Sequence, residues 1–123
     1  MPQVLASAVR TADTTANITG YNPLKNNGLM LIVDWTVDGG GNITPKVNIF
    51  DDAASAWVLF TGFASINTVG TYIYVIRESE AVAASPITEV LARQIPNATN
   101  LQLLMDHSGS QSHTYSVSAL WYP

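Results

Sequence analysis

The two histidines of the chain are the side chains whose type and spacing most suggest a chemical site. Asp106, His107 and His113 flank a predicted turn over residues 108–112, and a carboxylate beside two imidazoles can bind a transition metal or exchange a proton. Transition-metal sites usually need three or four converging ligands, and no further protein ligand is evident nearby. The pattern therefore favours a structural role for both histidines, with no metal and no cofactor.

Other candidate groups lack the pattern that their chemistry would require. Ser108 and Ser110 lie next to the first histidine, but HSGSQS is not a G-x-S-x-G elbow between a strand and a helix. Asp51 and Asp52 do not have the ligand spacing of a calcium loop. The segment 38–42, DGGGN, lacks the Lys-Ser/Thr of a phosphate loop and leads into a strand pattern. With no cysteine in the chain, thiol chemistry and disulfides are excluded, and no catalytic residue is predicted.

The elements that would position the histidines are predicted to be two strands of one β-hairpin. Apolar residues alternate with polar ones on both sides of the predicted turn, as expected when one face of an antiparallel pair covers a core. The residues predicted to face each other on the apolar side are His107 and His113, Met105 and Tyr115, Leu103 and Val117, and Leu101 and Ala119.

A second hairpin is predicted from residues 29–37 and 43–50, with DGGGN as its tip. In this register Val33 faces Val47 and Leu31 faces Ile49. Asp34 meets Lys46, and Thr36 meets Thr44. Opposite charges and a Thr pair at facing positions support the register independently of the apolar alternation.

The remaining pattern is that of an all-β chain. Further strands are predicted at 3–10, 56–60, 71–77 and near Val90, and a short strand or extended arm within 17–23, whereas most of 78–100 is predicted as loop. Short strands at this spacing are typical of a sandwich or barrel. We therefore predict one domain over residues 1–123, a single antiparallel β-sandwich of about eight short strands, jelly-roll-like or immunoglobulin-like.

Charge is sparse along the whole chain. Only 11% of the residues are charged and the formal net charge is −4, against roughly 25% charged residues in ordinary soluble domains. A nucleic-acid partner is not expected, because it would need a basic patch. No signal peptide, membrane anchor or membrane partner is expected either. Weakly charged surfaces suit packing against other subunits, because few ions must be desolvated.

The aromatic residues allow a second interpretation. Trp35, Trp57, Trp121, Tyr72 and Tyr74 could together form a platform for sugar rings. At alternating strand positions, however, large aromatics belong more often to a core or a subunit interface. The pattern favours the core or interface and leaves a carbohydrate-binding module as an alternative.

Four segments carry a resemblance to a known group of proteins: ASAVRTADTT, YNPLKNNGLMLIVDWT, GTYIYVI and DHSGSQSHTYSVSALWYP. In this order the chain resembles short virion proteins of tailed bacteriophages. The usual Leu-Pro-Arg before the last strands appears here as Leu91-Ala92-Arg93, and the DGGGN loop is longer than usual. The resemblance implies a β-sandwich without enzymatic activity, made in the host bacterial cytoplasm and located on the virion.

The preferred function is that of a capsid decoration or cement protein on the capsid surface, with the major capsid protein as partner. A tail or baseplate-associated subunit and a virion carbohydrate-binding module are the alternatives. The sparse charge predicts self-association, and the resemblance implies a trimer. The weakly charged, β-prone termini are predicted to supply the subunit interface, with Val4, Leu5, Val9, Trp121, Tyr122 and Pro123 as its residues.

Overall fold

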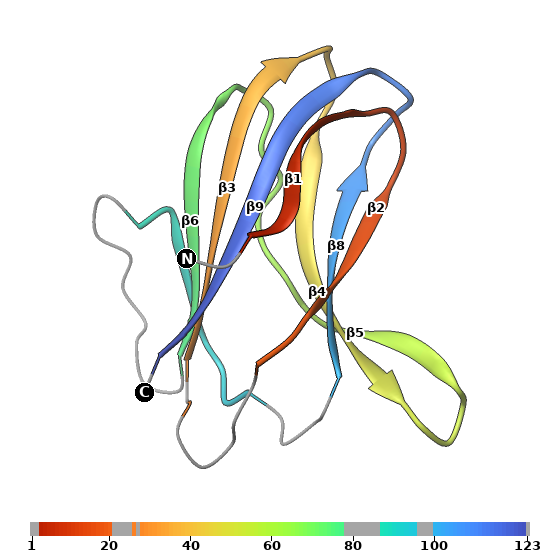
Figure 1. Ribbon diagram of the computed structural model, residues 1–123, viewed down its shortest axis with the longest axis vertical. Helices are drawn as coiled ribbons and strands as arrows, with labels where there is room; N and C mark the ends of the chain where they lie inside the picture. The colour runs from red at the N-terminus through yellow and green to blue at the C-terminus, as the bar shows by residue number, and fades with distance from the viewer. Residues whose placement is uncertain (1–2, 21–25, 27, 78–86, 96–99, 123) are drawn as a thin grey trace.

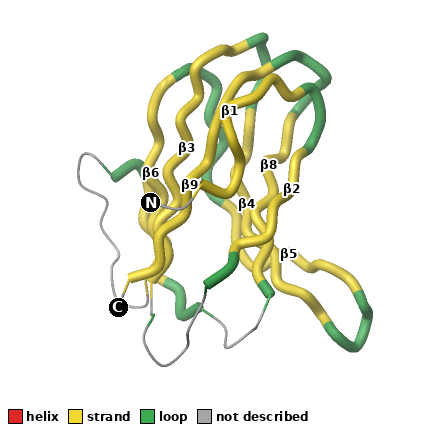
Figure 2. The backbone as a smooth tube through the Cα atoms, in the orientation of Figure 1, coloured by secondary structure: helices red, strands yellow, loops and turns green. Residues whose placement is uncertain are grey.

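Strands make up the regular structure of the protein. The computed structural model describes residues 3–20, 26, 28–77, 87–95 and 100–122, and these contain nine strands and no helix (Figures 1 and 2). Nothing helical in this part of the chain has the length and apolar character needed to cross a membrane. The strands are β1 (Gln3–Arg10), β2 (Thr14–Ile18), β3 (Gly28–Asp38), β4 (Ile43–Asp51), β5 (Ala56–Gly62), β6 (Gly70–Arg77), β7 (Glu89–Ala92), β8 (Leu101–His107) and β9 (His113–Tyr122).

The strands form two sheets that pack face to face. One sheet has the order β1-β9-β3-β6-β7 and the other the order β2-β8-β4-β5. The predicted β-sandwich is confirmed. The prediction that it is wholly antiparallel is wrong at one pair, because β7 runs parallel to β6.

The path of the chain between the sheets is that of a jelly roll. The chain stays within one sheet only from β4 to β5 and from β6 to β7, and it changes sheet at every other connection between consecutive strands. Apart from the short β7, this gives eight strands in two interleaved four-stranded sheets, as in jelly rolls. The immunoglobulin-like alternative has a different division of its strands between sheets.

The core lies between the inner faces of the two sheets. Alternate residues of each central strand point inward, as the two-residue period of a strand requires. The four-stranded sheet contributes Val47, Leu103 and Met105, and the five-stranded sheet contributes Val33 and Val117, all of them fully buried. The predicted inward-facing residues of residues 101–119 are therefore confirmed as core.

The predicted hairpin of residues 101–107 and 113–119 is wrong. β8 pairs with β2 and β4, whereas β9 pairs with β1 and β3. The two strands belong to opposite sheets, and His107 and His113 face each other across the sandwich, with 5.3 Å between ring centroids. Alternation identifies inward-facing residues but does not distinguish a hairpin from a loop that crosses between sheets.

The second predicted hairpin fails for the same reason. β3 pairs with β6 and β9, whereas β4 pairs with β5 and β8. Lys46 is therefore not opposite Asp34, and its Nζ lies 2.6 Å from Asp106 Oδ2 on the neighbouring strand. Asp34 Oδ1 instead accepts a hydrogen bond from Thr71 Oγ1 at 3.3 Å.

The crossing loops at one end of the sandwich are bonded to one another. Asn42 N donates to Ser108 Oγ at 2.8 Å, and Ser108 N donates to Asn42 O at 3.0 Å. A Cβ atom on Gly39 would lie 2.2 Å from Ser112 O, so the two loops approach more closely than a side chain permits. Gly40 and Gly41 have φ values of +105° and +82°, where glycine is favoured. These contacts explain three consecutive glycines between β3 and β4.

The other predicted elements are largely confirmed. Residues 52–55 form the turn of a true hairpin between β4 and β5, where Asp51 Oδ1 accepts hydrogen bonds from Ala53 N and Ala54 N. This β4–β5 hairpin projects from the body of the sandwich (Figure 1). β7 lies at the strand predicted near Val90, whereas residues 78–86 and 96–99 lie outside the described residues. The strand predicted within 17–23 begins earlier than expected, because β2 runs from Thr14 to Ile18, where Thr and Ile side chains favour a strand. Residues 21–25 lie outside the described residues.

Candidate functional site

The two histidines join the sheets at the end where the crossing loops meet. His107 Nε2 lies 2.8 Å from the hydroxyl of Tyr115, which comes from the opposite sheet. The ring of His113 packs edge-on against Trp35 at 5.2 Å between centroids. His113 Nδ1 is 3.5 Å from Asp38 Oδ1. Both imidazoles are buried, so this cluster connects the two layers from inside.

Burial controls the electrostatics of this cluster. Removal from water lowers the pKa of His107, and the neighbouring His113 lowers it further. Within the described residues the Nδ1 atoms of both histidines have no hydrogen-bond partner, and no group of three or more His, Cys, Asp or Glu side chains could hold a metal ion. Ser108 Oγ accepts a hydrogen bond from the backbone N–H of Asn42. The geometry of the two histidines therefore suits a role in packing between the sheets.

The cluster makes stability depend on pH. The fold lowers the pKa of His107 below its ordinary 6.5, so the folded state favours the neutral imidazole. The contribution of neutral His107 to the free energy of unfolding is therefore fully present above pH 6.5. It is lost as the pH falls through 6.5 toward the folded-state value. We expect the free energy of unfolding from urea titrations to decrease between pH 7.5 and pH 5.5. This range lies above the ordinary pKa of aspartate, about 3.9.

The matched variant is His107→Gln, whose amide can still reach the Tyr115 hydroxyl. His113, Asp13, Asp106 and Arg10 also act on His107 and remain in the variant. A smaller decrease over the same pH range is expected for the variant, whatever its stability at pH 7.5. An equal decrease in both proteins would contradict the assignment to His107.

The predicted interface residues occupy two different places. Val4, Leu5 and Trp121 are half-buried and pack against the core. Val4 and Trp121 line a groove of about 360 Å³ between the ends of β1, β9 and β2, and Trp121 Nε1 donates to Thr19 O at 2.7 Å. Val9 lies near the other end of β1, where it is opposite Thr114 and 66% exposed. The groove and Val9 are therefore separate features. Pro123 lies outside the described residues, and Tyr122 is the last residue of β9.

Strand β1 forms one edge of the five-stranded sheet. Its pairing with β9 shifts register between Leu5 and Ala8, and the guanidinium of Arg10 donates there to the carbonyls of Ala6 and Tyr115, at 2.5 Å each. A bulge of this kind twists an edge and discourages unspecific strand addition. The exposed side of the strand is otherwise uncharged.

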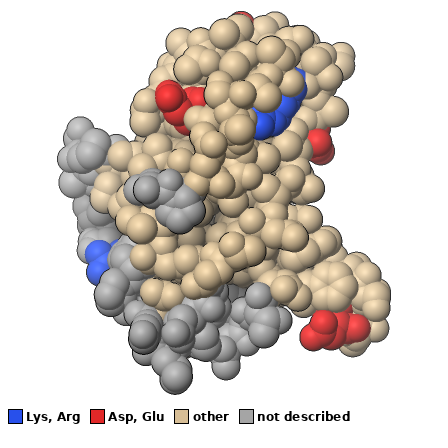
Figure 3. Space-filling model, in the orientation of Figure 1, with Lys and Arg blue, Asp and Glu red and all other residues tan. Residues whose placement is uncertain are grey.

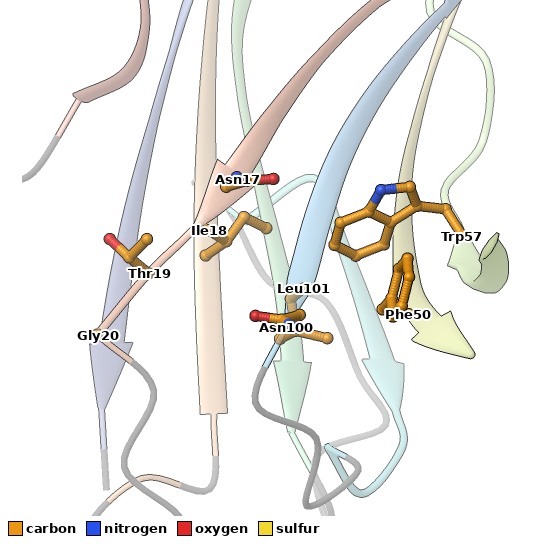
Figure 4. A pocket seen from close by; sticks show the side chains of 8 residues that line it. All are labelled: Asn17, Ile18, Thr19, Gly20, Phe50, Trp57, Asn100 and Leu101. Atoms are coloured by element: carbon orange, nitrogen blue, oxygen red, sulfur yellow. The ribbon is translucent and has the colours of Figure 1, made fainter. Parts of the chain in front are cut away.

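A cleft of about 370 Å³ lies on the four-stranded sheet, beside the projecting hairpin. Its aromatic side is formed by Phe50 and Trp57, whose rings meet edge-on at 5.3 Å between centroids. Asn17 lies on the opposite side, and Asn100 and Leu101 lie between them (Figure 4). None of the residues that line the cleft is charged. They are Asn17, Ile18, Thr19, Gly20, Phe50, Trp57, Asn100 and Leu101.

The five aromatic residues singled out in the sequence do not form one platform. Trp35 and Tyr74 are buried in the core, and Tyr72 and Trp121 pack against it. Trp57 alone among them lines the cleft. The sequence pattern gave no reason to choose Phe50 or the two asparagines, although Phe50 and Trp57 are paired across the predicted turn at 51–55.

Comparisons with known proteins bear on the fold. No protein-family model matches the chain, and no curated protein matches it either. A solved structure described as "Crystal structure of PirA" is similar, with a TM-score of 0.52 and 11% sequence identity over 97% of this chain and 94% of that chain. At this identity the similarity establishes a shared fold and transfers no function.

Proposed function

We propose that the protein is a non-enzymatic structural subunit of a tailed-bacteriophage particle, acting as a decoration or cement protein on the capsid. The proposal starts from the resemblance of the sequence to short virion proteins. Jelly-roll sandwiches are common in viral capsid proteins, which adds support by analogy of fold alone.

The observation that carries the proposal is the sparsely charged surface. The chain exposes 6412 Å², yet only 11% of its residues are charged. Figure 3 shows few charged groups on the face in view, with acidic side chains at the end of the projecting hairpin. Such a surface can pack against a neighbouring subunit without burying unpaired charges, and its contacts depend little on salt.

Exposed apolar residues on this surface offer contacts. Val9 is 66% exposed on the edge strand β1, and Leu59 is 60% exposed on β5. We propose that Val9 belongs to the subunit interface, with the major capsid protein or further copies of the chain as partner. Val4, Leu5 and Trp121 hold the edge strand and the groove in place from the core side. The trimer implied by the resemblance is part of this proposal.

The decisive experiment compares particles with and without the protein. Particles that lack it are expected to release DNA at a lower temperature, and the purified protein is expected to co-sediment with them and restore their stability by binding the assembled lattice. Val9→Asp should weaken co-sedimentation at least tenfold, because it places a charge in the contact. Its own melting temperature should not change, because Val9 is exposed.

Val69→Asp is the control variant, because Val69 is 52% exposed and lies outside the edge strand. This variant should bind the particles normally. Binding to tails in place of heads would favour the tail or baseplate alternative. Particles that are equally robust without the protein would overturn the decoration proposal. Sedimentation of the isolated protein at micromolar concentration measures whether it forms the expected oligomer by itself.

A further inference from the structure

The geometry points to the cleft beside the β4–β5 hairpin as a binding site for a neutral sugar ring, and we propose that Trp57 and Phe50 provide its stacking surface. This inference is independent of the particle-stabilising role, because it concerns a different surface from the edge at Val9.

The aromatic side of the cleft is available for contact. Phe50 and Trp57 are directly opposite each other on β4 and β5, so both rings lie on the outer face of the sheet. Each is only half-buried, and Figure 4 shows the Trp57 ring extending toward Asn17 across the cleft. A pyranose ring has an apolar C–H face, which packs favourably against the face of an aromatic side chain.

The rest of the lining offers hydrogen-bonding groups that the fold does not use. In the described part of the chain no hydrogen bond involves the side chains of Asn17, Thr19 or Asn100. An amide both donates and accepts hydrogen bonds, and a threonine hydroxyl does the same. These groups match the alternating donor and acceptor character of sugar hydroxyls.

Two neighbouring side-chain amides differ from those of the cleft, because they bond to each other. Asn48 and Gln102 lie on the same outer face, and Asn48 Nδ2 donates to Gln102 Oε1 at 3.1 Å. That pair is satisfied within the protein. In the cleft, by contrast, the Asn17 amide points toward the Trp57 ring, and Asn100 lies between the two (Figure 4).

Charge and size define the class of ligand. No lining residue is charged, so the cleft has no cation to bind a phosphate, a sulfate or an acidic sugar. Its volume of about 370 Å³ is at the lower end of the range for ligand pockets, roughly 300–1,000 Å³. A terminal neutral sugar or one ring of a neutral oligosaccharide fits these limits.

The test uses the full chain on an array of immobilised neutral and acidic oligosaccharides. We expect binding to neutral glycans that Trp57→Ala and the double variant Asn17→Ala, Asn100→Ala each weaken at least tenfold. Trp57→Phe should retain most of the binding, because it keeps an aromatic face. Asn67→Ala is the control, because Asn67 is an exposed asparagine outside the cleft.

Isothermal titration with the best glycan then measures the affinity of each variant, and circular dichroism checks that each is folded. Absence of neutral-glycan binding by the wild-type protein at millimolar concentration would overturn the proposal. Binding that survives both Trp57→Ala and the asparagine variant would place the site elsewhere and also overturn it. If the cleft bound a peptide side chain and no glycan, its ligand would be a peptide and the sugar proposal would be overturned.

Discussion

Replacing Leu103 by alanine is expected to lower the free energy of unfolding by about 2–5 kcal/mol, the usual cost of a cavity in a closely packed core. Leu103 lies in the middle of β8 and is fully buried between the two sheets. Its neighbours belong to both layers, so the core cannot collapse around the missing atoms without moving a strand. Urea unfolding measured by tryptophan fluorescence gives the value directly.

The matched control for this prediction is the next residue along the strand. Leu104 faces outward beside Lys46 and is half-buried. Leu104→Ala should therefore cost about 1 kcal/mol or less, since only part of its apolar area leaves contact with the protein. Equal costs at the two positions would contradict the assignment of the inner and outer faces of β8.

Replacing Gly39 by alanine is expected to have the next largest effect, with a loss of about 1–3 kcal/mol through overpacking. The added Cβ would lie 2.2 Å from the carbonyl oxygen of Ser112, and backbone cannot move aside without displacing a crossing loop. The melting temperature should fall by several degrees. Differential scanning calorimetry of the purified variant provides the measurement.

Gly109→Ala provides the comparison, because it adds the same atom at the same end of the sandwich. Its Cβ would lie 2.4 Å from Gln111 Oε1, which is the end of a flexible and exposed side chain. That group can rotate away, so the melting temperature should change little. A larger loss for Gly109→Ala than for Gly39→Ala would show that the loops do not meet as described.

The sequence was sufficient to predict which residues face the core and not which strands pair. Leu103, Met105 and Val117 follow a two-residue period that any sheet imposes. Pairing depends on whether the chain turns back within a sheet or crosses to the other one, and 108–112 and 38–42 both cross. The sequence predicts a pair between Asp34 and Lys46, because opposite charge alone does not show which carboxylate will lie beside the lysine. In the folded sheet, Asp106 is the carboxylate beside Lys46.

The cleft could not be predicted because its walls come from distant parts of the chain. Asn17, Trp57 and Asn100 are brought together only when β2, β8 and β5 join one sheet. The local signal of each residue is weak, since asparagine is typical of loops and tryptophan of cores. The histidines were correctly recognised as neighbours, although they meet across the sandwich.

The position of β9 determines when the protein can fold. Strand β9 lies between β1 and β3 in the five-stranded sheet, so β1 has no partner in its sheet until residues 113–122 have been synthesised. Pairings between residues so far apart in sequence make folding slow. A nascent chain that has not yet produced β9 would therefore leave β1 unpaired and one edge of β3 open, and the five-stranded sheet can close only after β9 has emerged.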